Sequence, residues 1–233
     1  MSDSVLEISD LTFQWASDSP VFSVSQLNLG RGERLFLKGA SGSGKSTLLS
    51  LIGGVTKAKS GSLKVLGEEL SQMKPKQRDR FRAEHLGLIF QQFNLIPYLS
   101  ALENVLLTGQ FSTQRKVAKS DALKMLSELG IDTQLANSQV TQLSIGQQQR
   151  VAAARALAGK PQLIIADEPT SALDQDTRDT YLDLLFSQCH NHNASLLFVS
   201  HDRTLAPLFD RELDITELAS WSKTGIRSEG EGG

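Results

Sequence analysis

Gly39-Ala40-Ser41-Gly42-Ser43-Gly44-Lys45-Ser46 matches the whole of the pattern G-x-x-x-x-G-K-[ST]. The apolar residues 35–37 before it predict a short buried strand, and residues 46–52 after it predict the start of a helix. This context distinguishes a phosphate-binding loop from a glycine–serine linker, which would not run directly into Lys-Ser-Thr-Leu-Leu. The stretch therefore predicts a binding site for a nucleoside triphosphate.

The chemistry expected of this loop follows from its backbone and two side chains. Successive N–H groups of the glycine-rich turn and of the helix N-terminus form a positively polarised cup for phosphate. Lys45 can reach the β- and γ-phosphates, and the Ser46 hydroxyl can coordinate Mg²⁺. We expect the nucleotide to contact Gly39, Ala40, Ser41, Gly42, Ser43, Gly44, Lys45, Ser46 and Thr47.

Length and composition are those of an ordinary globular chain. Its 233 residues, 39% hydrophobic and 21% charged, suffice for one large domain or two small ones with a real core. A net charge of -2 provides no basic field for nucleic acid, so we expect no nucleic-acid partner. No apolar run approaches the roughly 18 residues of a membrane span, and the acidic start has no secretory signal pattern. Cys189 is the single cysteine, which excludes an internal disulfide.

Hydrophobic patterning predicts an α/β fold, a P-loop NTPase core with a mainly parallel sheet. The apolar runs 163–166 and 196–199 are typical of buried parallel strands, and a helix over 176–189 completes a βαβ unit. Short alternating segments within residues 5–37 predict an N-terminal antiparallel β part. Leucine and alanine periodicity between residues 101 and 157 predicts a helical insertion.

We divide the chain into four parts on this pattern. Residues 1–91 form the first part of the nucleotide-binding core, residues 92–158 a helical subdomain, and residues 159–221 the second part of the core. The remaining residues 222–233 are rich in glycine and charge and predict a disordered tail. No final strand is expected after residue 215.

The segment Leu163-Ile164-Ile165-Ala166-Asp167-Glu168 is an apolar strand that ends in two acids. Both carboxylates then lie at the C-terminal edge of the sheet, beside the bound phosphates. We expect Asp167 to hold Mg²⁺ through water and Glu168 to orient or deprotonate the attacking water. The alternative interpretation is that the two acids cap the next turn.

A third motif is Leu143-Ser144-Ile145-Gly146-Gln147. A serine at a helix N-terminus can cap the helix and present N–H groups to an anion. With the loop and the acid pair, this motif resembles the signature of the ATP-binding cassette (ABC) ATPases, whose usual form is Leu-Ser-Gly-Gly-Gln, so Ile145 is a departure. The resemblance implies that Ser144, Gly146 and Gln147 face the γ-phosphate held by a second subunit; a plain capped helix is the alternative.

The resemblance implies roles for four further residues. Gln91 looks like the glutamine that reaches Mg²⁺ and the attacking water, and His201 looks like the switch histidine that completes the catalytic set. Asp174 falls in the loop that crosses the dimer interface. Trp15 falls where the family places an aromatic ring on adenine; we expect the competing Phe13 to point to the opposite face.

The resemblance covers roughly residues 5–213 and narrows, through residues 82–97 and 101–105, to bacterial ABC ATPases of lipoprotein release, macrolide efflux and cell division. It implies an ATPase with ATP and Mg²⁺ as cofactors, working as a homodimer with a separate integral-membrane permease. The expected position is peripheral, on the cytoplasmic side of the inner membrane. The alternative is a soluble ABC ATPase with non-membrane partners, although the hundred or so residues between Lys45 and Ser144 hold no coiled-coil heptads.

Two surface features leave alternatives open. The segment between Gln91 and about Val105 is expected to form the groove for the permease, lined by Phe93, Leu95, Ile96 and Leu99, some of which would be core residues. The basic run 74–82 could face anionic headgroups or form a solvated helix face paired with its own acids. The transported substrate is not encoded in these motifs, because that specificity belongs to the permease.

Overall fold

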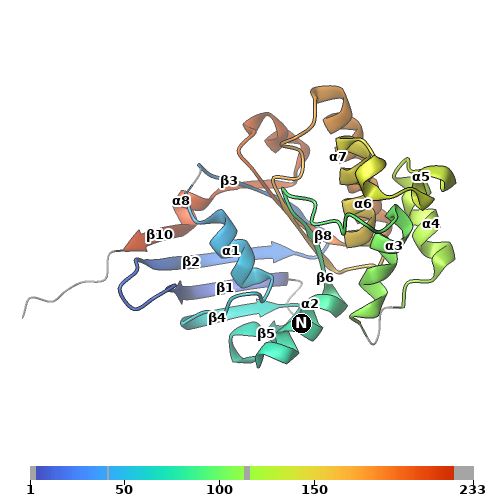
Figure 1. The fold of residues 1–233 in the computed structure, drawn as a ribbon. Coiled ribbons are helices and arrows are strands. Elements are labelled where there is room, and N and C mark those ends of the chain that lie inside the picture. Colours follow the sequence, from blue (N-terminus) through green and yellow to red (C-terminus); the bar gives the residue numbers. More distant parts are fainter. Residues whose placement is uncertain (1–3, 41, 113–115, 223–233) are drawn as a thin grey trace, which may run out of the picture.

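Two five-stranded sheets organise the computed structural model, which describes residues 4–40, 42–112 and 116–222 (Figure 1). One sheet is parallel and has the order β6-β7-β8-β3-β9. The other is antiparallel and has the order β10-β2-β1-β4-β5. The predicted fold class, an α/β core with a mainly parallel sheet and an antiparallel β part, is confirmed.

The parallel sheet is built from short apolar strands. The predicted strands at 35–37, 163–166 and 196–199 are confirmed, and β7 and β8 are almost wholly buried, as strands covered on both faces must be. The bounds are β3 Arg34–Lys38, β6 Leu86–Ile89, β7 Leu163–Asp167, β8 Ser195–Ser200 and β9 Arg211–Asp214.

The antiparallel sheet joins the two ends of the described chain. Its bounds are β1 Ser4–Phe13, β2 Val21–Gly30, β4 Ser60–Val65, β5 Glu68–Glu69 and β10 Ala219–Ser222. The expectation of no final strand was wrong, because β10 pairs with the edge of β2. Its four residues carry no apolar run to reveal it, and the backbone bonds of a long-range partner create it. The predicted tail begins at Ser222, the last residue of β10, and its residues 223–233 lie outside the described residues.

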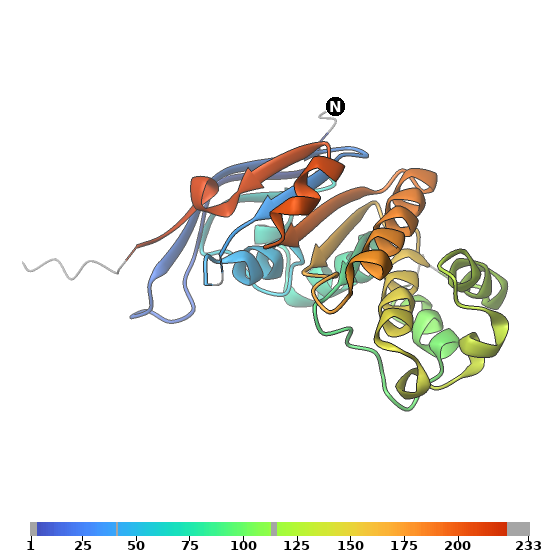
Figure 2. The ribbon, with the colours of Figure 1, turned by 90° about the horizontal axis from the view of Figure 1, so that it is seen from above.

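The helices contribute to two hydrophobic clusters. In one cluster, helix α1 packs its leucines and Ile52 against strands of both sheets. In the second cluster, α7 packs with α3–α6 (Figure 1). Figures 1 and 2 both show α3–α6 grouped to one side of the sheets. The α-helices are α1 Lys45–Ile52, α2 Pro75–His85, α3 Ala101–Leu106, α4 Lys119–Glu128, α5 Thr133–Asn137, α6 Ile145–Leu157, α7 Gln175–Asn191 and α8 Ile215–Leu218. The 3-10 helices are η1 Leu70–Gln72, η2 Leu107–Gln110, η3 Val140–Gln142 and η4 Arg203–Leu208.

Helix α2 contains most of the basic run 74–82, and the alternative that this run faces anionic headgroups stays a prediction. Arg82 pairs with Asp79 at 2.7 Å and Arg80 pairs with Glu84 at 2.9 Å, as the helix-face interpretation expects. Arg78 is buried and donates to the carbonyl oxygens of Gly54 and Met73. No α-helix in the described ranges is long and apolar enough to cross a bilayer.

Gly61 and Gly67 provide a test of how β4 packs on β1 in the antiparallel sheet. Both residues are exposed and both have a positive φ, 85° and 82°. A Cβ at Gly61 would lie 2.2 Å from the carbonyl oxygen of Asp10 in the bulged part of β1, whereas a Cβ at Gly67 would meet nothing within 4 Å. Only the first substitution therefore forces the backbone of β1 to move.

We expect Gly67→Ala to lower the free energy of unfolding by about 1 kcal/mol, the cost of a left-handed alanine. Gly61→Ala should lower it by about 3 kcal/mol or more, because overpacking against backbone adds to the same strain. Urea unfolding followed by circular dichroism measures both values. Equal losses in the two variants would contradict the packing of β4 on β1.

Candidate functional site

The glycine-rich loop joins β3 to α1 in the way the sequence predicts. Gly44 is the N-cap of α1 with φ 100°, and a Cβ there would lie 2.4 Å from the ring of Phe22. A glycine cap offers no side chain to the first-turn N–H groups, so these donors remain directed at an incoming anion. Ser41 was predicted to contact the nucleotide but lies outside the described residues.

Lys45 lies folded over the loop. Its Nζ donates to the carbonyl oxygens of Gly39 at 2.5 Å and Ala40 at 3.0 Å. The side chain of Ser43 donates to the Ala40 carbonyl at 2.7 Å and closes the turn. The ammonium group is thus held at the mouth of the cup, where a phosphate chain would enter.

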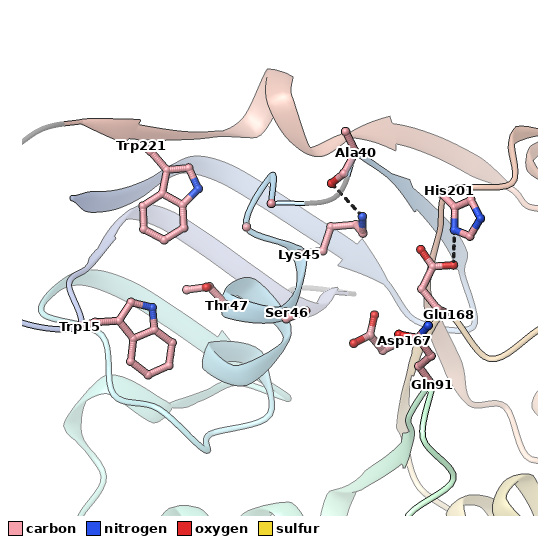
Figure 3. Close-up of a pocket in the computed structure, with 12 residues that line it drawn as sticks. Trp15, Ala40, Lys45, Ser46, Thr47, Gln91, Asp167, Glu168, His201 and Trp221 are labelled. Carbon is pink, nitrogen blue, oxygen red and sulfur yellow. Dashed lines mark hydrogen bonds and ion pairs between the residues drawn. The ribbon is translucent and has the colours of Figure 1, made fainter. Parts of the chain in front are cut away.

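One cavity of about 560 Å³ collects residues from both sheets (Figure 3). The acids, Gln91 and His201 lie at one end, the two tryptophans lie at the other, and α1 begins between them. The lining residues are Trp15, Ala40, Gly42, Gly44, Lys45, Ser46, Thr47, Gln91, Asp167, Glu168, His201 and Trp221.

The two acids occupy different surroundings although they are neighbours in the chain. Burial raises the pKa of Asp167 above its ordinary value, the charge of Glu168 raises it further, and Lys45 acts in the opposite direction. Ionised Asp167 is therefore short of solvation and of positive charge. A divalent cation bound nearby would supply both and would favour the carboxylate form.

Glu168 is held in place by its backbone and by two side chains. Its φ of 47° is unusual for a residue other than glycine and turns the chain sharply at the end of β7. The carboxylate accepts hydrogen bonds from Ser200 Oγ at 3.3 Å and from His201 Nδ1 at 2.9 Å. Only 9% of Glu168 is exposed, so the orientation of this group is well defined.

Trp15 lies just beyond the end of β1 and is 62% exposed. Its ring meets Phe13 edge to face, with centroids 4.8 Å apart. The expectation that Phe13 points to the opposite face was wrong, because residues two apart along an extended chain share a face. Phe13 is 5% exposed and supports the ring of Trp15 from the buried side.

Several predicted site residues lie elsewhere. Of the described residues that line the cavity, none comes from the signature or from the loop before α7. Ser144 and Gln147 cap α6 reciprocally, and Asp174 caps α7 by accepting from Thr177 N–H. Gly146 packs close to Thr177, so the signature and the Asp174 loop lie side by side on one surface. Gly39 and Ser43 shape the loop but do not line the cavity.

The sequence analysis missed Trp221. The residue lies on β10, which no pattern predicted, and it reaches the cavity only because β10 pairs with β2. Its signal in the sequence was its rarity, since the chain has two tryptophans and both line this cavity.

A family model described as ABC transporter matches residues 22–171. The uncharacterized ABC transporter ATP-binding protein YbbA of Escherichia coli (strain K12) is 44% identical over 190 residues, 80% of this chain and 82% of the relative. The lipoprotein-releasing system ATP-binding protein LolD of Xanthomonas axonopodis pv. citri (strain 306) is 40% identical over 198 residues, 84% of this chain and 81% of the relative.

Among solved structures, the ATP-binding cassette MJ0796 superposes with a TM-score of 0.80 and 32% sequence identity. The match covers 95% of this chain and 100% of that one. That structure is a dimer in a post-hydrolysis state with ADP and Pi bound. The chain described here therefore belongs to the ABC transporter family, and within that family it is one of the ATP-binding, ATP-hydrolysing subunits.

Proposed function

We propose that this chain hydrolyses ATP in a sandwich of two copies and thereby drives a separate membrane permease. One observation carries the proposal. The phosphate loop, the acid pair, Gln91 and His201 meet in one cavity, while the signature residues lie on another surface of the same chain. A second copy is the natural source of the missing half of the site.

The triphosphate binds to the loop through its backbone and through Lys45. The first-turn N–H groups of α1 donate hydrogen bonds to the phosphate oxygens, and the helix dipole favours the negative charge of those oxygens. Lys45 exchanges its two carbonyl partners for the β- and γ-phosphates, which are stronger acceptors because they are charged.

The donor set at the acidic end fits Mg²⁺. The Ser46 hydroxyl, the Gln91 amide oxygen and the Asp167 carboxylate all line the cavity, and all are the oxygen ligands that Mg²⁺ prefers. One carboxylate suffices, because Mg²⁺ in such sites keeps several waters and takes phosphate oxygens from the nucleotide. When bound, Mg²⁺ neutralises charge on the phosphates. The raised pKa of Asp167 supports the same position for a cation.

Glu168 acts on the attacking water. Its carboxylate accepts a proton from the water as the water oxygen bonds to the γ-phosphorus. The bond from that phosphorus to the β–γ bridging oxygen breaks, and ADP is the leaving group. His201 donates from Nδ1 to that carboxylate and so fixes its direction, while most of the imidazole stays exposed at the cavity. Ser200 supplies a second donor from within the sheet.

The second copy supplies the surface formed by Ser144, Gly146, Gln147 and Asp174. The capping residues Ser144 and Gln147 order the start of α6, whose N–H groups then face the γ-phosphate of the first copy. Ile145 is the first residue of this helix and is 56% exposed, so its side chain meets the partner rather than the core. The dimeric state of the MJ0796 structure supports the pairing of two copies.

A second cavity of about 700 Å³ is the dock for the permease. Apolar side chains of β6 and of the segment around η2 line it, with the polar face of α2 along one rim. Of the four expected lining residues this cavity contains only Ile96. Phe93 and Leu95 line a different cavity beside η3, and Leu99 lines neither. Docking there places the chain at the cytoplasmic side of the inner membrane, as a peripheral subunit.

Arg155 connects this dock to the nucleotide cavity. Burial lowers the pKa of its guanidinium, and the residue lines the dock. The guanidinium donates to the carbonyl oxygen of Phe93 at 2.8 Å and to that of Asn94 at 2.6 Å. Those residues follow Gln91 closely in the chain. A partner that moves Arg155 would therefore shift the segment that carries Gln91.

Lys45→Ala should raise the Kd for ATP at least tenfold and reduce hydrolysis below detection, because the charge-assisted contacts to the phosphates are lost. Lys57→Ala, which removes an exposed lysine outside the cavity, is the control and should leave both values unchanged. Calorimetry and a phosphate-release assay measure them. Parental ATP binding by Lys45→Ala would refute the loop assignment.

Glu168→Gln should bind ATP normally, but its hydrolysis rate should fall by at least about 10²-fold, because an amide cannot accept the proton. ATP should then hold a dimer that light scattering detects, and ADP should not. Glu217→Gln removes an exposed carboxylate outside the cavity and should behave as the parent does. A monomeric Glu168→Gln chain at saturating ATP would contradict the sandwich.

Phe111→Asp should abolish co-purification of the chain with an integral-membrane protein from detergent-solubilised membranes of its source. Phe111 lines the dock and is 74% exposed, and a carboxylate there would have to be desolvated on docking. Tyr98→Asp alters an equally exposed aromatic outside the dock and should retain the partner. Soluble partners that remain bound to both variants, with no membrane protein, would favour the soluble alternative.

A further inference from the structure

Trp221 lies in the nucleotide cavity although it belongs to the last described strand. It is 39% exposed and faces the same end of the cavity as Trp15, far from the acids (Figure 3). Large indoles left open to solvent at one place on a chain commonly mark a binding surface. The motifs that define the phosphate end do not account for this second ring.

The position of Trp221 is set by the register of three strands. Phe13 of β1 lies opposite Phe22 of β2, and Phe22 lies opposite Trp221 of β10. Residues directly opposite one another project from the same face of an antiparallel sheet, so the three rings form one row. Trp221 contacts Phe22 with centroids 4.9 Å apart and an interplanar angle of 46°.

Each tryptophan is therefore supported by a buried phenylalanine. Trp15 rests edge to face on Phe13, Trp221 rests on Phe22, and both phenylalanines are at most 5% exposed. The indoles lose little freedom when a ligand arrives, because their orientation is already restricted. Phe22 also lies directly beneath Gly44, which places the row beside the start of the phosphate loop.

We propose that Trp221 forms the second aromatic wall of the base site, so that the purine of the nucleotide stacks on both Trp15 and Trp221. This inference rests on the proposed ATP site. Phosphates on the loop leave the base at the tryptophan end, where Figure 3 shows the two indoles together, Trp221 above and Trp15 below. A purine covers more of two indole faces than a pyrimidine does, so the pair selects the size of the base.

The decisive comparison uses two ligands, ATP and inorganic tripolyphosphate, which has the phosphates without base or ribose. Trp221→Ala should raise the Kd for ATP by roughly tenfold, within the range that loss of one base–aromatic stack produces. The Kd for tripolyphosphate should stay within about twofold of the parental value, because the loop is intact. Trp221→Phe keeps a ring and should recover most of the affinity for ATP.

Ser220→Ala is the matched control. Ser220 is the preceding residue of β10, lies opposite Ser23 and lines a separate cavity on the other face of the sheet. Its replacement should leave both Kd values unchanged. Thermal unfolding of all variants checks that β10 remains paired.

Fluorescence supplies an independent measurement. Trp15→Phe leaves Trp221 as the sole tryptophan, and its emission should change on addition of ATP and not on addition of tripolyphosphate. An unchanged signal together with parental ATP affinity of Trp221→Ala would overturn the proposal. Equal weakening of ATP and tripolyphosphate would also overturn it, since Trp221 would then act through Phe22 on the loop. Failure of the ATP site itself is detected separately, by ATP binding to Lys45→Ala.

Discussion

At Gly44 the backbone turns with a φ of 100°, and the ring of Phe22 occupies the space where a Cβ would stand. Only glycine meets both conditions. The contact seats the start of α1, and with it the phosphate loop, on the antiparallel sheet, while β3 anchors the same loop in the parallel sheet. The relative placement of the phosphate end and the base end of the cavity depends on this one close approach.

The catalytic end of the cavity follows from the parallel sheet. Neighbouring parallel strands end at one edge, so Asp167 at the end of β7 and Glu168 directly after it lie beside the end of β8. There Glu168 meets Ser200 and His201. The arrangement gathers negative charge in a buried place, and the raised pKa of Asp167 reflects its cost. A divalent cation would offset this charge, which supports the proposal that the nucleotide binds there with magnesium.

Capping explains why the signature surface is available to another chain. Ser144 and Gln147 satisfy each other's backbone groups, and Asp174 accepts from the Thr177 N–H at the start of α7. Both helices therefore start without help from the nucleotide cavity of their own chain. The N-termini of α6 and α7 are then preformed before any partner arrives. A preformed surface would reduce the entropy lost in the proposed closure of two copies on ATP.

The sequence by itself determined the features that depend on neighbours along the chain. These include the strand–loop–helix around Lys45, the acid pair after β7, the caps of α6 and α7, and a family resemblance that rests on the order of such motifs. Tertiary structure decided the rest. The pairing of β10 that brings Trp221 to the cavity, and the lining of the proposed permease dock, arise from contacts between segments far apart in the chain. The support of Trp15 by Phe13 is a side-chain contact that only the folded structure shows. A short stretch of sequence carries little information about such contacts. The free energy that forms each contact comes from another part of the structure, which that stretch does not include.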